Sequence, residues 1–199
     1  KDPFSGFYST LHEAGHGLYE QGLPAEWTHS PLAEAASMGI HESQSLLYED
    51  QFGRSRPFWK WAEGQFREGF LKSVPAEQLY AVTNRVQAGF IRVNADEVSY
   101  GLHVIARYEM EKAIVSGDLP VEEIPTAWRE KYRDYLGIVP PDDRQGCLQD
   151  VHWHIGHLGY FPTYLIGRLY SAQIFQAFRR DHPDWDRQCS RGEFGLLKQ

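Results

Sequence analysis

Apolar side chains recur every three or four residues over long stretches of the chain, and Pro and Gly residues separate these stretches. Such spacing is typical of amphipathic α-helices, because it gathers the apolar positions on one face. Proline is favoured in the first turn of a helix and glycine just after the last one, so the breaks also predict the helix ends. The helices predicted in this way cover residues 4–20, 31–52, 57–72, 76–86, 95–115, 121–136 and 160–180.

The stretch 95–115 has a long and regular apolar pattern that ends at Gly117. Positions at helical spacing are expected to form the face that packs against the rest of the protein. The residues expected on that face are Val98, Leu102, Ile105, Tyr108 and Ala113.

Strand patterns are scarce. Residues 89–93 are the best short extended candidate, because they are apolar and partly β-branched, and residues 139–143 form a loop by composition. No internal repeat or linker-like tract divides the sequence. We therefore predict an all-α fold with at most a short β element, organised as one helical unit over residues 1–199.

Composition narrows the function classes. The 27 acidic and 20 basic side chains give a formal net charge of −7, which argues against nucleic acid as a partner. Two cysteines, Cys147 and Cys189, do not supply a disulfide scaffold or a thiolate metal site, so a reducing, cytoplasmic location is expected. No stretch is long and apolar enough to predict a membrane partner.

The sharpest chemical feature is the run His12-Glu13-Ala14-Gly15-His16. On a helix, residues four apart project from one face, so the two imidazoles can reach a single cation such as zinc. Glu13 falls where a carboxylate can act on a metal-bound water as general base. Apolar residues flank the run, and burying unpaired imidazoles is costly, which also favours a metal partner.

The motif leaves the third ligand open. No further histidine follows at metzincin spacing, so a carboxylate from the next predicted helix is the alternative. Small residues at Ala35, Ala36, Ser37 and Gly39 would let that helix approach the first one closely. The candidates are Glu34, His41, Glu42 and Glu49, of which Glu42 is preferred.

Several ordered motifs resemble a known family. Residues 11–24 surround the two histidines, and residues 39–45 read Gly-Ile-His-Glu-Ser-Gln-Ser. Residues 91–96 read Ile-Arg-Val-Asn-Ala-Asp, and residues 146–153 read Gly-Cys-Leu-Gln-Asp-Val-His-Trp. Together with residues 159–164, these motifs resemble the thermostable zinc carboxypeptidases of peptidase family M32 over essentially the whole chain.

The resemblance implies an almost entirely helical fold with the metal in a deep groove, and a homodimer. It implies that His12, His16 and Glu42 bind Zn²⁺, that Glu13 is the general base and acid, and that the substrates are peptides with a free C-terminus. Cobalt or manganese could replace zinc.

The sequence also departs from the family. Members are considerably longer and carry an upstream His-Pro-Phe motif and an Asp-x-Arg-x-Thr motif that do not occur here. The chain starts at Lys1 rather than Met, and residues 191–199 look like the start of a helix. We therefore expect a catalytic-core fragment, truncated at both ends, of a larger metallocarboxypeptidase.

Further catalytic candidates lie in the motif at residues 146–153 and in residues 159–164. Asp150 and His152 could form an oriented acid and imidazole pair, and Tyr160 or Tyr164 could donate a phenol hydroxyl to the developing oxyanion. Aromatic residues at helical spacing are also common in cores, so both interpretations stay open.

An exopeptidase must bind a free carboxylate, for which arginine is well suited. Arg92 is the candidate, and an ion pair with Asp96, four residues on, is the structural alternative.

The function predicted from the sequence is a zinc metallocarboxypeptidase, a hydrolase that releases single C-terminal residues. The alternatives are a catalytically incompetent metal-binding helical fragment and a zinc endopeptidase or aminopeptidase.

Overall fold

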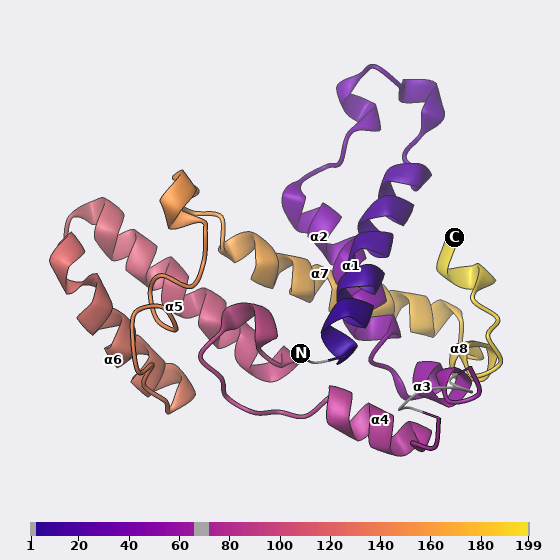
Figure 1. Ribbon diagram of the computed structural model, residues 1–199. Helices are drawn as coiled ribbons and strands as arrows, with labels where there is room; N and C mark the ends of the chain where they lie inside the picture. Colours follow the sequence, from indigo (N-terminus) through magenta and orange to yellow (C-terminus); the bar gives the residue numbers. More distant parts are fainter. Residues whose placement is uncertain (1–2, 66–71, 199) are drawn as a thin grey trace. The chain divides into compact units, whose positions relative to one another are not determined.

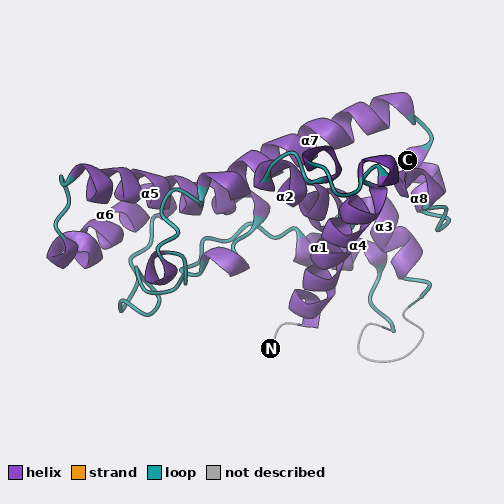
Figure 2. Cartoon of the chain, turned by 90° about the horizontal axis from the view of Figure 1, so that it is seen from above, coloured by secondary structure: helices purple, strands orange, loops and turns teal. Residues whose placement is uncertain are grey.

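The computed structural model describes residues 3–198 except 66–71, and every regular element in these residues is a helix (Figures 1 and 2). The absence of strands from this part of the chain confirms the all-α prediction. The α-helices are α1 (Pro3–Gly22), α2 (Met38–Leu46), α3 (Arg56–Ala62), α4 (Ala76–Thr83), α5 (Glu97–Ser116), α6 (Ile124–Leu136), α7 (Pro162–Asp181) and α8 (Trp185–Cys189). The shorter elements are η1 (Ala25–Trp27), η2 (Pro31–Ala33), η3 (Leu47–Phe52), η4 (Arg92–Asn94), η5 (Val121–Glu123), η6 (Trp153–Ile155) and η7 (Gly195–Lys198).

The contacts within the chain group its residues into two compact units. Unit 1 comprises residues 1–84 and 166–199, and unit 2 comprises residues 85–165. No described helix has the length and apolar character needed to cross a membrane.

The second predicted helix is interrupted. It was expected to run over 31–52, but the short η2 ends at Ala33 and α2 starts only at Met38. Ser37 has extended backbone angles, and its side chain accepts a hydrogen bond from the backbone N–H of Ile40, so it caps a new helix. After Leu46 the helix widens into η3, a π-helix.

Two other predictions needed correction. The extended candidate at 89–93 forms no strand, and a short 3-10 turn, η4, begins within it. Helix α3 ends at Ala62 rather than at residue 72; part of the predicted helix, residues 66–71, lies outside the described residues.

Unit 1 has an aromatic core. Trp59 and Cys189 are fully buried, and Trp185, Phe58 and Phe52 lie with them in one cluster of side chains. Ring contacts such as the edge-to-face pair of Phe52 and Phe58, with centroids 4.9 Å apart, hold η3 against α3. This packing fixes the position of η3, which carries the carboxylates of Glu49 and Asp50.

Unit 2 is built around helix α5, whose buried face differs from the predicted one. Val98 is 66% exposed and Ile105 is 36% exposed, whereas Val104, Arg107 and His103 are buried. The error has a physical cause: charged side chains on this face are buried because they find partners within unit 2. A hydrophobicity pattern assigns such residues to the surface.

Candidate metal centre

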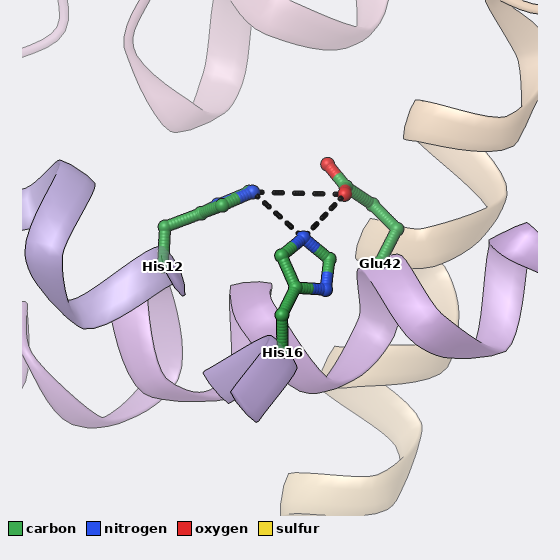
Figure 3. A group of neighbouring side chains, drawn as sticks. All are labelled: His12, His16 and Glu42. Carbon is green, nitrogen blue, oxygen red and sulfur yellow. Dashed lines mark hydrogen bonds and ion pairs between the residues drawn. The ribbon is translucent and has the colours of Figure 1, made fainter. Parts of the chain in front are cut away.

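Helix α1 presents His12 and His16 one turn apart, so both imidazoles leave the same face (Figure 3). Gly15, between them in the sequence, faces helix α2. A Cβ atom at Gly15 would lie 2.6 Å from both the carbonyl oxygen of Gln44 and the Cα of Ser45. Only glycine permits this approach, so Gly15 sets the spacing of the two helices that hold the site.

The small residues expected to provide this approach do not do so. Ala35 and Ala36 precede α2, and Ser37 caps it. Gly39 lies on α2, where a Cβ would meet the side chain of Ile166 at 3.4 Å. The close contact between the two helices is made at Gly15 of α1 instead, and its partners on α2 are Gln44 and Ser45.

Three electron-pair donors converge between α1 and α2 (Figure 3). The Nε2 atoms of His12 and His16 are 3.2 Å apart, and Oε2 of Glu42 lies 3.7 Å from the first and 3.5 Å from the second. Zinc binds such ligands tetrahedrally at about 2.0–2.2 Å, which separates neighbouring ligand atoms by roughly 3.3 Å. The donor set and its spacing therefore fit a shared zinc ion.

Glu42 is held in place by two neighbours. Gly167 on α7 lies against its side chain, where an added Cβ would approach Glu42 Cγ to 2.9 Å. Ser45 is buried, and its hydroxyl donates to the backbone carbonyl of Glu42 at 2.7 Å and contacts Oε2 at 3.5 Å. Packing on both sides thus limits the rotamers open to the carboxylate.

Each histidine also has a partner on its other nitrogen. Nδ1 of His12 lies 2.9 Å from Oε2 of Glu49, and Nδ1 of His16 lies 2.6 Å from Nδ1 of His41. A carboxylate only accepts hydrogen bonds, so Nδ1 of His12 carries the hydrogen. In the neutral ring, Nε2 then turns a lone pair toward Glu42, and a cation between them is favourable.

The pKa shifts of the three candidate ligands also favour a cation between them. Burial opposes a charge on His12, but the hydrogen bond with Glu49 and the charges of Glu42 and Glu49 outweigh it and raise the pKa of His12. Burial and the neighbouring imidazoles lower the pKa of His16. Burial raises the pKa of Glu42. Without a metal ion, a proton is the cation that competes for this site.

The structure also places the other candidates for the third ligand. Glu34 is exposed just after η2, while Glu49 and His41 contact the outer nitrogens of His12 and His16. Among the residues that the structure describes, the group able to share a metal ion is His12, His16 and Glu42. Glu13 is exposed on α1, and its charge acts on both histidines.

In unit 2, three of the predicted catalytic residues lie together. Nε2 of His152 is 3.0 Å from the hydroxyl of Tyr164, and the rings of Tyr160 and Tyr164 meet edge to face with centroids 5.3 Å apart. Burial and the charge of Arg92 lower the pKa of His152. The imidazole is therefore favoured in its neutral form beside a phenol hydroxyl.

The expected pairing of Asp150 with His152 does not form. Oδ1 of Asp150 accepts from Nε and Nη2 of Arg92 at 3.0 and 2.8 Å, and Oδ2 accepts from Nε of Arg107 at 2.7 Å. Two buried guanidinium groups compete better for this carboxylate than one neutral imidazole does. Nδ1 of His152 is buried and, within the described residues, has no hydrogen-bond partner.

Arg92 is only 5% exposed and does not pair with Asp96. Besides Asp150, it donates from Nη1 to the hydroxyl of Tyr100 at 2.8 Å. Asp96 instead caps α5, where its Oδ1 accepts from the backbone N–H groups of Val98 and Ser99. The ion-pair alternative from the sequence is thus wrong, because the carboxylate of Asp96 is committed to the helix terminus.

Sequence reasoning missed several residues of these networks. It gave no role to Arg107, and it treated Glu49 only as a possible ligand. Arg54 donates to Glu49 and Asp50 at 3.4 and 3.1 Å, and its guanidinium lies over the ring of Tyr8. The i, i+4 spacing of Asp50 and Arg54 was the available signal for part of this network.

Comparison with known proteins identifies the family of this chain. The chain matches the profile of the family described as Carboxypeptidase Taq (M32) metallopeptidase over residues 1–199. Carboxypeptidase 1 of Bacillus subtilis (strain 168) is 45% identical over 202 residues, which cover 100% of this chain and 40% of that protein. Thermostable carboxypeptidase 1 of Thermus thermophilus is 47% identical over 192 residues, covering 96% of this chain and 38% of that protein.

Solved structures agree. An M32 carboxypeptidase from Deinococcus radiodurans R1 matches with a TM-score of 0.91 at 44% identity, over 96% of this chain and 39% of that chain. A carboxypeptidase from Pyrococcus furiosus matches with a TM-score of 0.92 at 37% identity, over the same shares. This chain spans about 40% of the length of the curated relatives it matches. On this match over its whole length, the chain belongs to the M32 family of metallopeptidases.

Proposed function

We propose that the protein containing this chain is a zinc metallocarboxypeptidase that releases single C-terminal residues from peptides. The observation that carries the proposal is the convergence of Nε2 of His12, Nε2 of His16 and Oε2 of Glu42. Membership of the M32 family and the names of the relatives support it. Cobalt or manganese could serve in place of zinc.

When bound at this triad, zinc would polarise the scissile carbonyl and lower the pKa of a water molecule to about 7. Glu13 is exposed on α1 beside the first ligand and is free to act as the base. It takes a proton from the attacking water as the new C–O bond forms. It then donates that proton to the leaving amine as the peptide C–N bond breaks.

His152, Tyr160 and Tyr164 are proposed as donors to the oxyanion that develops on the carbonyl. The contact of His152 with Tyr164 supports this role, because it orients the phenol hydroxyl and the imidazole toward each other. Loss of one such donor typically lowers the rate about 10²–10³-fold. We expect Tyr164→Phe to fall in that range while zinc affinity is retained.

Arg92 is proposed to bind the C-terminal carboxylate of the substrate. Asp150 and Tyr100 hold its guanidinium in one position. We also propose, from the family resemblance, that the protein is a cytoplasmic homodimer.

The test is product analysis on the zinc-loaded protein with an N-blocked dipeptide. Release of the C-terminal residue, and its loss in Glu13→Gln at unchanged zinc content, is the expected result. Equal behaviour of the two proteins would contradict the catalytic role of this chain. Stoichiometric zinc without turnover would instead support the alternative of a catalytically incompetent metal-binding fragment.

Longer peptides distinguish the remaining alternatives. A carboxypeptidase shortens them one residue at a time from the C-terminus. Internal cleavage would indicate an endopeptidase, and release from the N-terminus would indicate an aminopeptidase.

A further inference from the structure

We propose that His41 and Glu20 form a hydrogen-bond relay that holds His16 in the tautomer able to bind a metal ion. The inference rests on the proposed metal site and assigns a role to two residues that do not belong to the ligand triad. Both are positioning residues, since they act through His16.

Three side chains form a continuous chain of contacts from the triad to the surface. Nδ1 of His16 lies 2.6 Å from Nδ1 of His41, and Nε2 of His41 lies 2.8 Å from Oε1 of Glu20. The side chain of His41 is 16% exposed and that of Glu20 is 54% exposed. Tyr19 packs edge-on against the ring of His41, with centroids 5.2 Å apart. The imidazole at the centre of the relay is therefore held by contacts on three sides.

The hydrogen positions follow from what each group can do. The carboxylate of Glu20 only accepts, so Nε2 of His41 carries the hydrogen. In a neutral ring, Nδ1 of His41 is then an acceptor, and Nδ1 of His16 must be the donor. That assignment leaves the lone pair of His16 on Nε2, the atom that faces His12 and Glu42.

The opposite direction would block the site. If Nδ1 of His41 donated, the hydrogen of a neutral His16 would move to Nε2 and point into the triad. Glu20 prevents this because it accepts from the far side of His41. An exposed carboxylate outside the triad thus determines the direction of a hydrogen bond to a metal ligand.

The two histidine ligands consequently have different supports. His12 donates directly to a carboxylate, Glu49, whereas His16 reaches a carboxylate only through a second imidazole. The direction of the His12 bond is fixed by chemistry, because a carboxylate has no hydrogen to donate. The His16 bond can run either way, so it is the one that needs Glu20.

The first experiment measures zinc affinity by chelator competition in Glu20→Gln. The glutamine amide can donate to Nε2 of His41 and so permits the blocking direction. We expect zinc to bind about tenfold more weakly, at the lower end of the range for residues that orient metal ligands. The matched control is Glu26→Gln, an exposed position on η1 with the same change of charge, and we expect it to bind zinc as the unsubstituted chain does.

A second substitution separates the relay from a simple loss of charge. In His41→Asn, the side-chain amide can turn its oxygen toward Nδ1 of His16 and accept without help from Glu20. Adding Glu20→Gln to His41→Asn should then cost no further zinc affinity. A full, additive loss in the double variant would contradict the relay.

Nitrogen-15 spectra of the metal-free protein at neutral pH read the tautomers directly, before a metal ion can impose them. We expect the hydrogen of His41 on Nε2 and that of His16 on Nδ1. Finding it on Nδ1 of His41, or equal zinc affinity of Glu20→Gln and Glu26→Gln, would overturn the relay. Absence of zinc binding by the unsubstituted chain would instead overturn the proposed metal site, so the two failures are distinguishable.

Discussion

At the scale of single residues, the candidate site is defined by atoms rather than by residue types. Nε2 of His12 faces Glu42 and Nδ1 faces Glu49, so the two ring nitrogens have separate roles. Such outer partners fix the orientation of a ligand before the metal arrives. We therefore expect the affinity of the proposed site for a metal ion to depend also on residues that do not touch the ion.

Glu49 provides a test at this scale. Glu49→Leu removes the acceptor for Nδ1 of His12, and we expect zinc to bind about 10–100-fold more weakly. Glu49→Gln keeps an oxygen acceptor, so its loss should be smaller. Chelator competition gives both affinities, and thermal unfolding of the metal-free proteins shows whether the fold is kept. A larger loss in Glu49→Gln than in Glu49→Leu would contradict this role.

The residues that could be predicted from the sequence are those with a local signal. His12 and His16 follow from helical geometry alone, because four positions on a helix return to the same face. Glu42 was preferred among four candidates because small residues lie near it, and the family motif supported that choice, but the sequence does not fix its distance from α1. The outer role of Glu49 could not be seen, because it lies 37 positions from His12 on a π-helix whose wider turn changes which residues share a face.

At the scale of elements, glycine spacing decides how closely α1 and α2 approach. Gly15 faces the backbone of α2, whereas an added Cβ at Gly17 would meet nothing within 4 Å. We expect Gly15→Ala to lower the free energy of unfolding by about 1–3 kcal/mol, because the helices must separate. Its zinc affinity should fall as well, since the ligands come from both helices.

Gly17→Ala is the matched control on the same helix. Alanine is favoured over glycine in helices by up to about 1 kcal/mol, so this variant should be as stable as the unsubstituted chain or more stable. Urea unfolding of the two variants measures the difference. Equal destabilisation by both substitutions would show that the close approach at Gly15 is not what matters.

The ion network of unit 2 gives a second prediction for an element. Asp150 accepts hydrogen bonds from two buried arginines, Arg92 on η4 and Arg107 on α5, and so links these two elements. Asp150→Asn leaves these two cations without a carboxylate, and we expect a loss of about 3–5 kcal/mol in the free energy of unfolding at neutral pH. Urea unfolding followed by tryptophan fluorescence is the measurement.

The pH dependence of that loss has a definite sign. Burial alone would raise the pKa of Asp150, but the charges and hydrogen bonds of Arg107 and Arg92 outweigh it and lower the pKa. A carboxylate with a lowered pKa stabilises the fold fully above its unfolded value of about 4 and loses that contribution as the pH falls through the folded value. The difference between the two proteins should therefore shrink below about pH 4. A constant difference would contradict the assignment.

Most helices could be predicted from the sequence, but the buried face of α5 could not. The apolar periodicity selected Val98 and Ile105, which are exposed. Arg107 and His103 are buried instead because hydrogen bonds to distant residues compensate their polarity. Hydrophobic periodicity carries no information on such partners, so it fails where a core contains paired charges.

At the scale of the whole molecule, the ordered motifs identified the family because they extend over the length of the chain. Each motif alone specifies a few side chains, whereas their order along one chain specifies a fold. The division into two units was not visible in the sequence, because no repeat or linker-like tract marks it. The candidate metal ligands His12, His16 and Glu42 belong to unit 1, and His152, Tyr160 and Tyr164 belong to unit 2.

The central claim is that three side chains of this chain bind one zinc ion. Calorimetric titration of zinc into the metal-free protein tests it most directly, with Glu42→Ala and Glu34→Ala measured alongside. We expect one ion per chain for the unsubstituted protein and for Glu34→Ala, and no tight binding for Glu42→Ala. Tight stoichiometric binding by Glu42→Ala would contradict the account.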